Sequence, residues 1–437
     1  MKKDMARTPI EHILKPVSRF IHQEFTGGIV LFVSVIIAII WANSPARESY
    51  LHLWETNLRV GFNNMTFDKP LHIWINDGLM ALFFFVIGLE LKREFIAGEL
   101  SSMKKASLPM IAALGGMIVP ALIYISMNSG LSSSGGWGIP MATDIAFSLA
   151  LLSLAGRRIP ASVKVFLSAL AVADDLGAVL VIAFFYTAKI AFFPLVIAGG
   201  VLMLLVAGNL LGIRHPIFYL ILGIIVWAGF LMSGVHATIA GVLVAFTIPA
   251  RPKIDEDEFL RDARCYADEF EVARRQDGSL ISPEQLRALE KIKQLSVDAE
   301  TPLQKIENSL HPWVAFIIMP LFALANSGMV IGNDFFSSLV NPVSMGILLG
   351  LFFGKFIGVF SFTWLMVKMK LASLPGNAKW MHICGVAILA GIGFTMSLFI
   401  TGLAFTDEVF ITQAKYGILV ASFIAGTVGL VVLRRIK

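Results

Sequence analysis

The stretch ASVKVFLSALAVADDLGAVLVIAFFYT, residues 161–187, decides the fold class, because it is long and apolar enough to cross a lipid bilayer as one helix. Asp174 and Asp175 are its only acidic residues and stand side by side in its middle. One carboxylate at the centre of a membrane helix costs roughly 2.5–3.5 kcal/mol on insertion scales, and two neighbours cost more. A structural pair is the alternative, but the cost favours ion or proton chemistry.

The composition places the whole chain in a membrane. Of its 437 residues 57% are hydrophobic and only 15% are charged, whereas soluble domains are about 25% charged. The apolar runs are continuous rather than alternating, which indicates helices and argues against a barrel. Cys265 and Cys384 are far apart and suggest neither a disulfide framework nor a thiolate metal site. We therefore predict an all-α polytopic membrane protein without a bound cofactor.

The length rule gives about twelve membrane spans. Their approximate limits are 27–43, 71–91, 107–127, 138–156, 161–187, 192–212, 216–233, 236–250, 312–331, 343–367, 382–404 and 411–433, and the one at 236–250 is short. The chain then divides into an amphipathic cytoplasmic N-terminal segment (1–26), spans 1–8 (27–250), a cytoplasmic insertion (251–305), and spans 9–12 with a short cytoplasmic C-terminus (306–437).

Alternate loops differ strongly in lysine and arginine content. One set, which includes both termini, holds 29 of the 35 basic residues, and the opposite set holds five. By the positive-inside rule both termini are cytoplasmic, which requires an even number of spans. The net charge of +5 therefore reflects membrane orientation and does not indicate a nucleic-acid partner.

Two of the predicted loops are more than connectors. Residues 57–69 have β-prone flanks around Asn63–Asn64 and predict an external hairpin. Within the insertion, Leu286, Leu289, Ile292 and Leu295 recur at helical spacing, which predicts a short amphipathic helix.

Two further charged residues lie inside predicted spans. Lys355 has about a dozen largely apolar residues on each side, which is too central for easy snorkelling, so we expect it to have a buried partner. Asp144 follows Gly138 and Pro140, which disfavour a continuous helix. Thr143 and Asp144 then suit the N-cap of a second half-helix. Capping alone would explain Asp144, but a capping acid inside the membrane can also face an ion site.

A second interrupted helix is predicted at GIGFTMSLFI, residues 391–400. Gly391 and Gly393 permit unwinding there, and Thr395 and Ser397 can satisfy freed backbone groups. Two broken spans at corresponding places in two halves indicate a transporter's binding site. If the spans cross, Asp144 could offset paired helix N-termini and Lys355 paired C-termini.

The aspartate pair can be assigned a chemistry from its surroundings. Burial and mutual repulsion both favour the protonated carboxyl, and the two groups titrate as a coupled unit. A nearby Lys355 would hold one member ionised, while the other could exchange a proton for a cation. Hard cations take oxygen ligands, and the carboxylates, Thr143 and unwound carbonyls supply them. Na⁺ and H⁺ would then compete for the same oxygens.

Several stretches together resemble the NhaA-type sodium/proton antiporters of bacterial inner membranes. The most specific are IPMATDIAFSLALL (139–152), LSALAVADDLGAVLVIAFFYT (167–187) and GIGFTMSLFITGLAF (391–405), and similar stretches run in the family's order over residues 24–435. The resemblance implies inverted-topology repeats with two broken helices that cross at the membrane midplane.

The resemblance also implies roles for single residues. Asp175 looks like the main Na⁺ ligand, with Asp174 and Thr143 beside it, Asp144 on the first broken helix, and Lys355 as the partner of Asp174. Glu90, Glu94, His236 and Glu307 match positions linked to pH response, and Asp77 matches an acid on the periplasmic side. A solvated helix end explains Glu90 and Glu94 equally well, and a structural histidine explains His236. The insertion is longer than the family's usual connector.

The sequence thus predicts a secondary antiporter that exchanges cytoplasmic Na⁺ or Li⁺ for external protons by alternating access, electrogenically and under pH control. The resemblance also implies a place in the bacterial inner membrane and a homodimer formed through the external hairpin, which is similar to the family's dimerisation element. One alternative is a Na⁺-coupled carrier of a small organic solute, although the residues around the pair are small and aliphatic. An intramembrane aspartyl protease would leave Lys355 and the helix breaks unexplained, and a channel would need rings of acids.

Overall fold

The computed structural model describes residues 24–62, 65–156, 159–187, 190–273, 281–332, 335–336 and 339–436, with the side chains of 24–25 and 60–67 left aside. The predicted N-terminal segment (1–26) therefore lies almost wholly outside the described residues, as do Asn63–Asn64 at the tip of the predicted hairpin.

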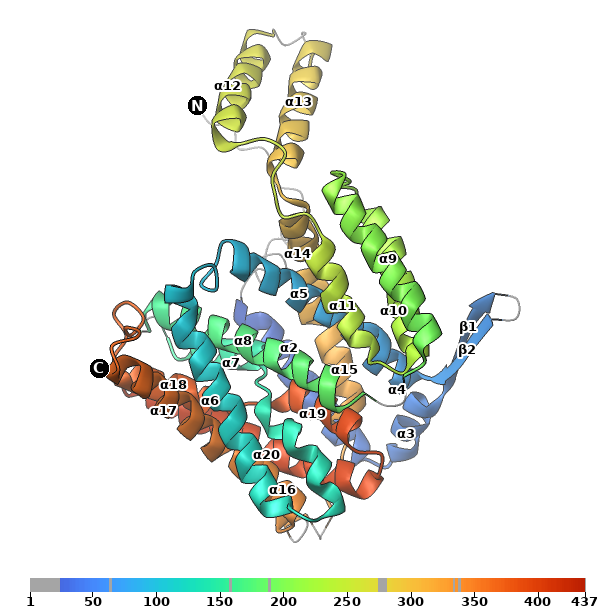
Figure 1. Cartoon of the computed structure of the whole chain (residues 1–437), viewed down its shortest axis with the longest axis vertical. Coiled ribbons are helices and arrows are strands. Elements are labelled where there is room, and N and C mark those ends of the chain that lie inside the picture. The colour runs from blue at the N-terminus through green and yellow to red at the C-terminus, as the bar shows by residue number, and fades with distance from the viewer. Residues whose placement is uncertain are drawn as a thin grey trace.

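The first half of the chain alternates long helices with short irregular elements (Figure 1). In chain order these are α2 (Glu24–Ala42), α3 (Arg47–Glu55), strands β1 (Asn57–Phe62) and β2 (Met65–Pro70), α4 (Leu71–Ile73), the π-helix η1 (Trp74–Leu79), α5 (Met80–Ile96), α6 (Met103–Asn128), the 3₁₀-helix η2 (Ser132–Met141), α7 (Ile145–Leu154), α8 (Ala161–Phe185), α9 (Phe192–Leu210), α10 (Pro216–Ser233) and α11 (Ala237–Thr247).

The second half begins with the insertion and returns to the membrane. Its elements are α12 (Glu256–Val272), α13 (Pro283–Ala299), α14 (Pro302–Trp313), the π-helix η3 (Val314–Ile318), α15 (Met319–Asn326), α16 (Pro342–Leu349), the π-helix η5 (Gly350–Gly354), α17 (Lys355–Lys368), α18 (Trp380–Leu389), α19 (Phe394–Ala404) and α20 (Glu408–Arg434).

The described residues form a polytopic helical membrane protein. Eight helices are long and apolar enough to span a bilayer, and the number rises to 11 if each of three bent helix pairs counts as one span. The prediction of about twelve is higher because it included α11, whose 11 residues are too few to cross the membrane alone. A helix is nevertheless present at each predicted span.

Two of the bent pairs are the predicted broken spans. Helices η2 and α7 meet at 42°, and α18 and α19 also meet at 42°. The third pair, α2 and α3, bends by 113° and was not predicted. Three long spans also contain the π-helical segments η1, η3 and η5, which widen a helix by one residue in a turn. Hydrophobic spacing gave no sign of them.

Glycines bring α6, from the first half of the chain, into close contact with η5 and α17, from the second. A Cβ placed on Gly115 of α6 would lie 2.5 Å from the carbonyl oxygen of Gly358 on α17, and one on Gly354 would lie 2.8 Å from the Cα of Pro120. Small residues permit such backbone approach in membrane helices. This packing fixes α17, and hence its first residue Lys355, against α6, which also packs on α8.

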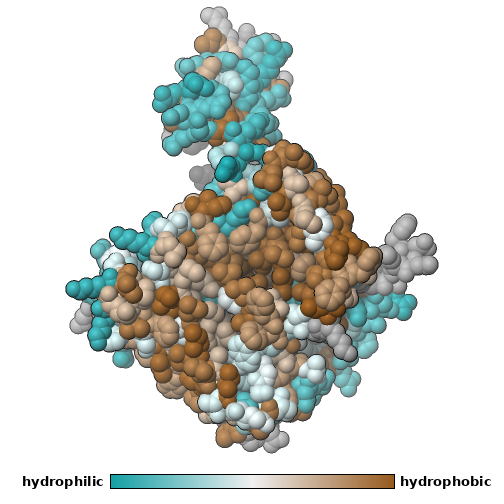
Figure 2. All heavy atoms as spheres, in the orientation of Figure 1, coloured by the Kyte–Doolittle hydropathy of each residue, from teal (hydrophilic) through white to brown (hydrophobic). Residues whose placement is uncertain are grey.

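Both loops that were predicted to be structured are structured, and the insertion contains one more helix than predicted. Strands β1 and β2 pair antiparallel with Asn57 opposite Pro70, which confirms the hairpin. The insertion contains two amphipathic helices, α12 and α13, where the sequence predicted one. This helical hairpin projects from the body and is largely hydrophilic, whereas the body's surface is largely hydrophobic (Figures 1 and 2).

Candidate functional site

The two broken spans meet at their breaks. The backbone N–H of Asp144, at the first break, donates to the carbonyl oxygen of Ile392, at the second, over 2.7 Å. Helix ends leave backbone groups unpaired, and these must be satisfied within the protein when no water is near. The contact shows that each break supplies partners for the other.

The Asp144 carboxylate accepts hydrogen bonds at the N-termini of two half-helices, α7 and α19. One carboxylate oxygen accepts the N–H of Phe147 on α7 at 3.0 Å, and the other accepts the N–H and the hydroxyl of Thr395 on α19 at 3.1 and 2.5 Å. A negative group at a helix N-terminus is favourable, and here one group faces two. The predicted arrangement of Asp144 at paired N-termini is therefore confirmed.

Hydroxyl groups complete the crossing in a reciprocal pattern. Ser148 of α7 donates to the carbonyl oxygen of Leu389, the last residue of α18, at 3.0 Å. Ser397 of α19 donates to that of Ile139 in η2 at 2.8 Å. Each second half-helix thus binds a carbonyl of the opposite first half-helix. Ser148 was not singled out from the sequence, because a serine within an apolar run gives no sign of its partner.

Among the described residues, only one carboxylate oxygen of Asp174 has hydrogen-bond partners. The Nζ of Lys355 and the hydroxyl of Thr143, at 2.6 Å, both contact its Oδ2, and all three side chains are at most 2% exposed. The Thr143 hydroxyl also lies 2.8 Å from the carbonyl oxygen of Ala390. A hydroxyl carries one proton, so Thr143 donates to either the carboxylate or the carbonyl at a given moment.

The predicted pairing of Lys355 with Asp174 is thus present. A role for Lys355 at the paired helix C-termini stays a hypothesis, since the hydrogen bonds found there come from Thr143 and Ser148.

Asp175 has no such partners. It is fully buried, and among the described residues neither of its carboxylate oxygens has a hydrogen-bond donor, nor does Oδ1 of Asp174. Leaving a buried carboxylate without a donor is costly. The arrangement leaves three carboxylate oxygens available to a proton or a hard cation in one buried region.

The acids matched to pH response gather around Arg93, to which the sequence pattern assigned no role. Arg93 on α5 binds Glu307 on α14 at 2.5 Å, and lies 3.5 Å from Glu94 and 3.9 Å from Glu90. Glu307 is 5% exposed. Arg93 stands directly after Lys92 at what the sequence predicts to be a solvated helix end. Its neighbours in the sequence therefore gave no sign that it binds Glu307 and so links α5 to α14.

Asp77 and His236 lie elsewhere. Asp77 is in η1, and its carbonyl oxygen accepts the indole N–H of Trp227 on α10 at 3.1 Å. His236 precedes α11, and its Nε2 is 2.7 Å from the carbonyl oxygen of Tyr186. Within the described part of the chain, no hydrogen bond joins either residue to the aspartate pair.

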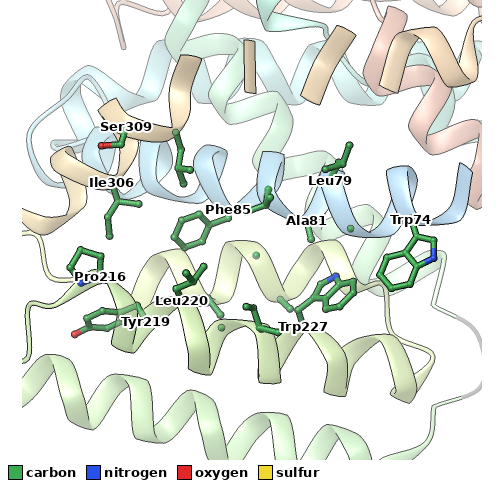
Figure 3. A pocket seen from close by; sticks show the side chains of 18 of the residues that line it. Trp74, Leu79, Ala81, Phe85, Pro216, Tyr219, Leu220, Trp227, Ile306 and Ser309 are labelled. Carbon is green, nitrogen blue, oxygen red and sulfur yellow. The ribbon is translucent and has the colours of Figure 1, made fainter. Parts of the chain in front are cut away.

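A large cavity lies apart from these groups. It has a volume of about 860 Å³ and is lined by α4–η1–α5, α10, α11 and α14 (Figure 3). Its walls are almost wholly apolar, with Trp74 and Trp227 toward one end and Tyr219 toward the other. None of the residues around the aspartate pair lines it. An apolar cavity cannot replace the hydration shell of an ion, so the polar crossing is the candidate ion site.

Comparison with known proteins agrees with this geometry. The model of the family "Na+/H+ antiporter 1" matches residues 18–433. The "Na(+)/H(+) antiporter NhaA" of Oleidesulfovibrio alaskensis is 48% identical over 430 residues, which cover 98% of this chain and 96% of that protein. The "Na(+)/H(+) antiporter NhaA 2" of Syntrophotalea carbinolica is 46% identical over 427 residues, which cover 98% of each chain. The chain therefore belongs to the Na⁺/H⁺ antiporter 1 family.

Proposed function

We propose that this sodium/proton antiporter binds its cation at Asp175, with Oδ1 of Asp174 and the Thr143 hydroxyl completing the protein ligands. The observation that carries the proposal is the set of three buried carboxylate oxygens without a donor. Na⁺ and Li⁺ are hard cations and favour such oxygens over other donors. A proton binds the same oxygens, so the two ions compete directly.

Lys355 and Thr143 give Asp174 and Asp175 different roles, because, of these two acids, both contact Asp174 alone. The ammonium group and the hydroxyl both act on Oδ2 of Asp174, which keeps that oxygen occupied and leaves Oδ1 free. Asp175 then changes most between the protonated and the cation-bound states. Two carboxyls and one amine serve one monovalent cation, so more than one proton can leave as the cation enters, which would make the exchange electrogenic.

The crossing of the broken helices supplies a means of alternating access. Asp144, Ser148 and Ser397 hold the two breaks to each other, whereas the aspartate pair lies on the continuous helix α8. Movement of the joined half-helices against α8 would expose the pair to one side of the membrane at a time. Such movement of one repeat against another is the usual mode in transporters with broken helices.

The orientation in the cell follows from charge. The loops rich in lysine and arginine support an orientation with both termini and the insertion on the cytoplasmic side of the bacterial inner membrane. The β1–β2 hairpin is then external and suits contact with a second subunit, and the Arg93 cluster is cytoplasmic, where it can sense internal pH. External protons would drive the export of cytoplasmic Na⁺ or Li⁺.

Liposomes that contain the purified protein test this assignment. Na⁺ or Li⁺ added against an imposed pH gradient should dissipate it between pH 6.5 and 9, with no organic solute present. Asp175→Asn should lower the rate by about a hundredfold or more, because one oxygen ligand and the titrating group are lost. Asp407→Asn is the matched control, since Asp407 is exposed, caps α20, and asparagine caps equally well.

The outcome separates the candidate functions. Full exchange by Asp175→Asn would remove Asp175 from the proposed role. Gradient dissipation that required an added organic solute would favour the Na⁺-coupled solute carrier.

A further inference from the structure

Tyr186, the residue that follows α8, is bound to the first broken span through its side chain. Its hydroxyl donates to the carbonyl oxygen of Gly135 at 2.8 Å and accepts the backbone N–H of Gly138 at 3.1 Å, both in η2. The Trp137 ring stacks on the Tyr186 ring, with their centres 6.4 Å apart and their planes at 26°. One phenol oxygen thus acts as both donor and acceptor toward the backbone of η2.

The approach of this phenol depends on a glycine. A Cβ placed on Gly138 would lie 2.7 Å from the Tyr186 hydroxyl oxygen, which is too close for two atoms that are not bonded. Gly138 is not among the glycines with positive φ, so its backbone conformation alone does not require glycine. The sequence marked Gly138 only as a helix breaker, and the structure shows that it also makes room for the phenol.

The main chain of Tyr186 is held by a second element. Its carbonyl oxygen lies 2.7 Å from Nε2 of His236, which must be the donor because a carbonyl oxygen can only accept. His236 directly precedes α11, and α11 packs along α5. The end of α8 is therefore joined to η2 through the phenol and to α11 through the carbonyl.

Tyr186 lies on the same face of α8 as Asp175. At about 100° per residue the two differ by about 20° in direction, and they are about 16 Å apart along the helix. Val179 and Ile182 lie between them, within about 40° of Tyr186, and are 7% and 1% exposed. The Tyr186 N–H donates to the Ile182 carbonyl at 3.2 Å, so helical bonding continues to Tyr186. A route from Asp175 along this face would pass Val179 and Ile182 and end at Tyr186.

We propose that the Tyr186 phenol closes the external side of this route. The proposal rests on the alternating access proposed above, in which the joined half-helices move against α8, and on the orientation that makes this end of α8 external. While the phenol holds η2, the two elements cannot separate here, and the aspartate pair stays closed to the outside. Release of both hydrogen bonds lets η2 leave α8. Tyr186 is remote from the ion ligands and is therefore a positioning residue.

A second tyrosine binds the same 3₁₀-helix but is placed differently. Tyr124 of α6 is fully buried, and its hydroxyl donates to the carbonyl oxygen of Ser133 at 2.8 Å. Tyr186 is only partly buried, and its acceptor Gly135 is exposed. Water can therefore replace the partners of the Tyr186 hydroxyl when the contact opens. Tyr124 thus fixes the start of η2, about which the later residues of η2 can pivot away from α8.

External labelling of a buried cysteine tests the closure. Ile182→Cys, in a chain with Cys265 and Cys384 replaced by serine, places one thiol one turn inside Tyr186. The full-length protein in right-side-out vesicles is then treated from outside with a membrane-impermeant maleimide. Tyr186→Phe should raise the labelling rate about threefold to tenfold, as expected for the loss of a hydrogen bond of ordinary strength. In inside-out vesicles the same substitution should not raise it.

Tyr124→Phe is the matched control. It also removes a hydroxyl that binds η2, but from the buried attachment to α6. It should lower Tm without raising the rate of external labelling. An equal rise in Tyr124→Phe and Tyr186→Phe would show that any loosening of η2 is enough, and would overturn the assignment to Tyr186.

A second variant breaks the contact without altering Tyr186. Gly138→Ala places a methyl group against the phenol oxygen and should raise external labelling as Tyr186→Phe does. The double variant should label no faster than the faster single variant, because both remove the same contact. Effects that multiply would mean that the two substitutions act separately, and would contradict the proposed contact.

Exchange in liposomes gives a functional readout. More carrier facing outward should lower the apparent KM for external Na⁺ severalfold in Tyr186→Phe and raise that for internal Na⁺. If labelling and both KM values are unchanged while Asp175→Asn abolishes exchange, the closure is wrong and the proposed ion site stands. If Asp175→Asn keeps full exchange, the ion site is wrong, whatever the labelling shows.

Discussion

Removal of the Lys355 ammonium group should destabilise the fold in a pH-dependent way. Lys355 is fully buried and shares Oδ2 of Asp174 with Thr143, while Oδ1 of Asp174 has no donor among the described residues. Lys355→Ala leaves Asp174 with one neutral hydroxyl as its only described donor. Breaking a buried pair from one side costs about 3–5 kcal/mol.

Proton uptake by the orphaned carboxyl limits this cost. Protonating an ordinary aspartate, whose pKa is about 3.9, costs about 1.4 kcal/mol for each pH unit above that value. The loss of folding free energy should therefore be about 1.5 kcal/mol at pH 5 and about 4 kcal/mol at pH 7. Above pH 7 it should be nearly constant, because the unpaired carboxylate then costs no more than its protonation would. Asp174→Asn in the same chain removes the orphaned charge and should recover most of the stability at pH 7.

Thermal unfolding of the purified protein in detergent, followed by tryptophan fluorescence, measures the effect. We expect Lys355→Ala to lower Tm by several degrees at pH 7 and by much less at pH 5, each relative to the unsubstituted chain. A Tm equal to that of the unsubstituted chain at pH 7 would refute the pairing. An equal drop at both pH values, unaltered by Asp174→Asn, would show that lost packing rather than charge is responsible.

Three further predictions concern the other charged groups. Asp144→Ala should destabilise the protein by about 2–4 kcal/mol, because two half-helices lose their N-terminal acceptor, and unfolding in denaturant measures it. Arg93→Gln should shift the pH profile of exchange in liposomes, since Glu307 loses its ion pair; an unchanged profile would contradict a regulatory role. The hydrogen bond from Lys253 holds the pKa of Asp298 below its ordinary value, so this contact stabilises the hairpin above about pH 4 and is lost as pH falls further. A spin label on α13 should gain mobility below that pH, and Lys253→Met should abolish the dependence.

Much of the fold could be predicted from residue order because membrane spans are local. An apolar run of sufficient length must form a helix in lipid, whatever its neighbours. Breaks at Pro140 and Gly391 are local for the same reason, since both residues alter backbone freedom where they stand. The π-helical segments were not predicted because an extra residue in a helical turn is stabilised by packing against other helices, which the order of residues does not show. The second insertion helix, α12, was not predicted because seven of its 17 residues are acidic, which gives the stretch the composition of a polar loop.

In the candidate site too, the identity of the charged residues could be predicted from the sequence, whereas their pairing could not. The cost of burying charge marked Asp144, Asp174, Asp175 and Lys355 by sequence alone, because each stands within an apolar run. Those residues by themselves did not fix which aspartate Lys355 binds, and the family resemblance supplied that expectation. The choice is made in space, where α6 packs between α8 and α17 and brings together groups 181 residues apart.

The sequence by itself determined that this protein crosses a membrane, carries ionisable residues within its spans, and interrupts two of its helices, since each property depends on neighbouring residues. Only the tertiary structure decided how that charge is shared. Asp174 has Lys355 and Thr143 as partners, whereas Asp175, the next residue, points about 100° away on the same helix and has no donor among the described residues. Hydrogen bonds reach about 3 Å, so such differences depend on packing between helices that the order of residues does not reveal.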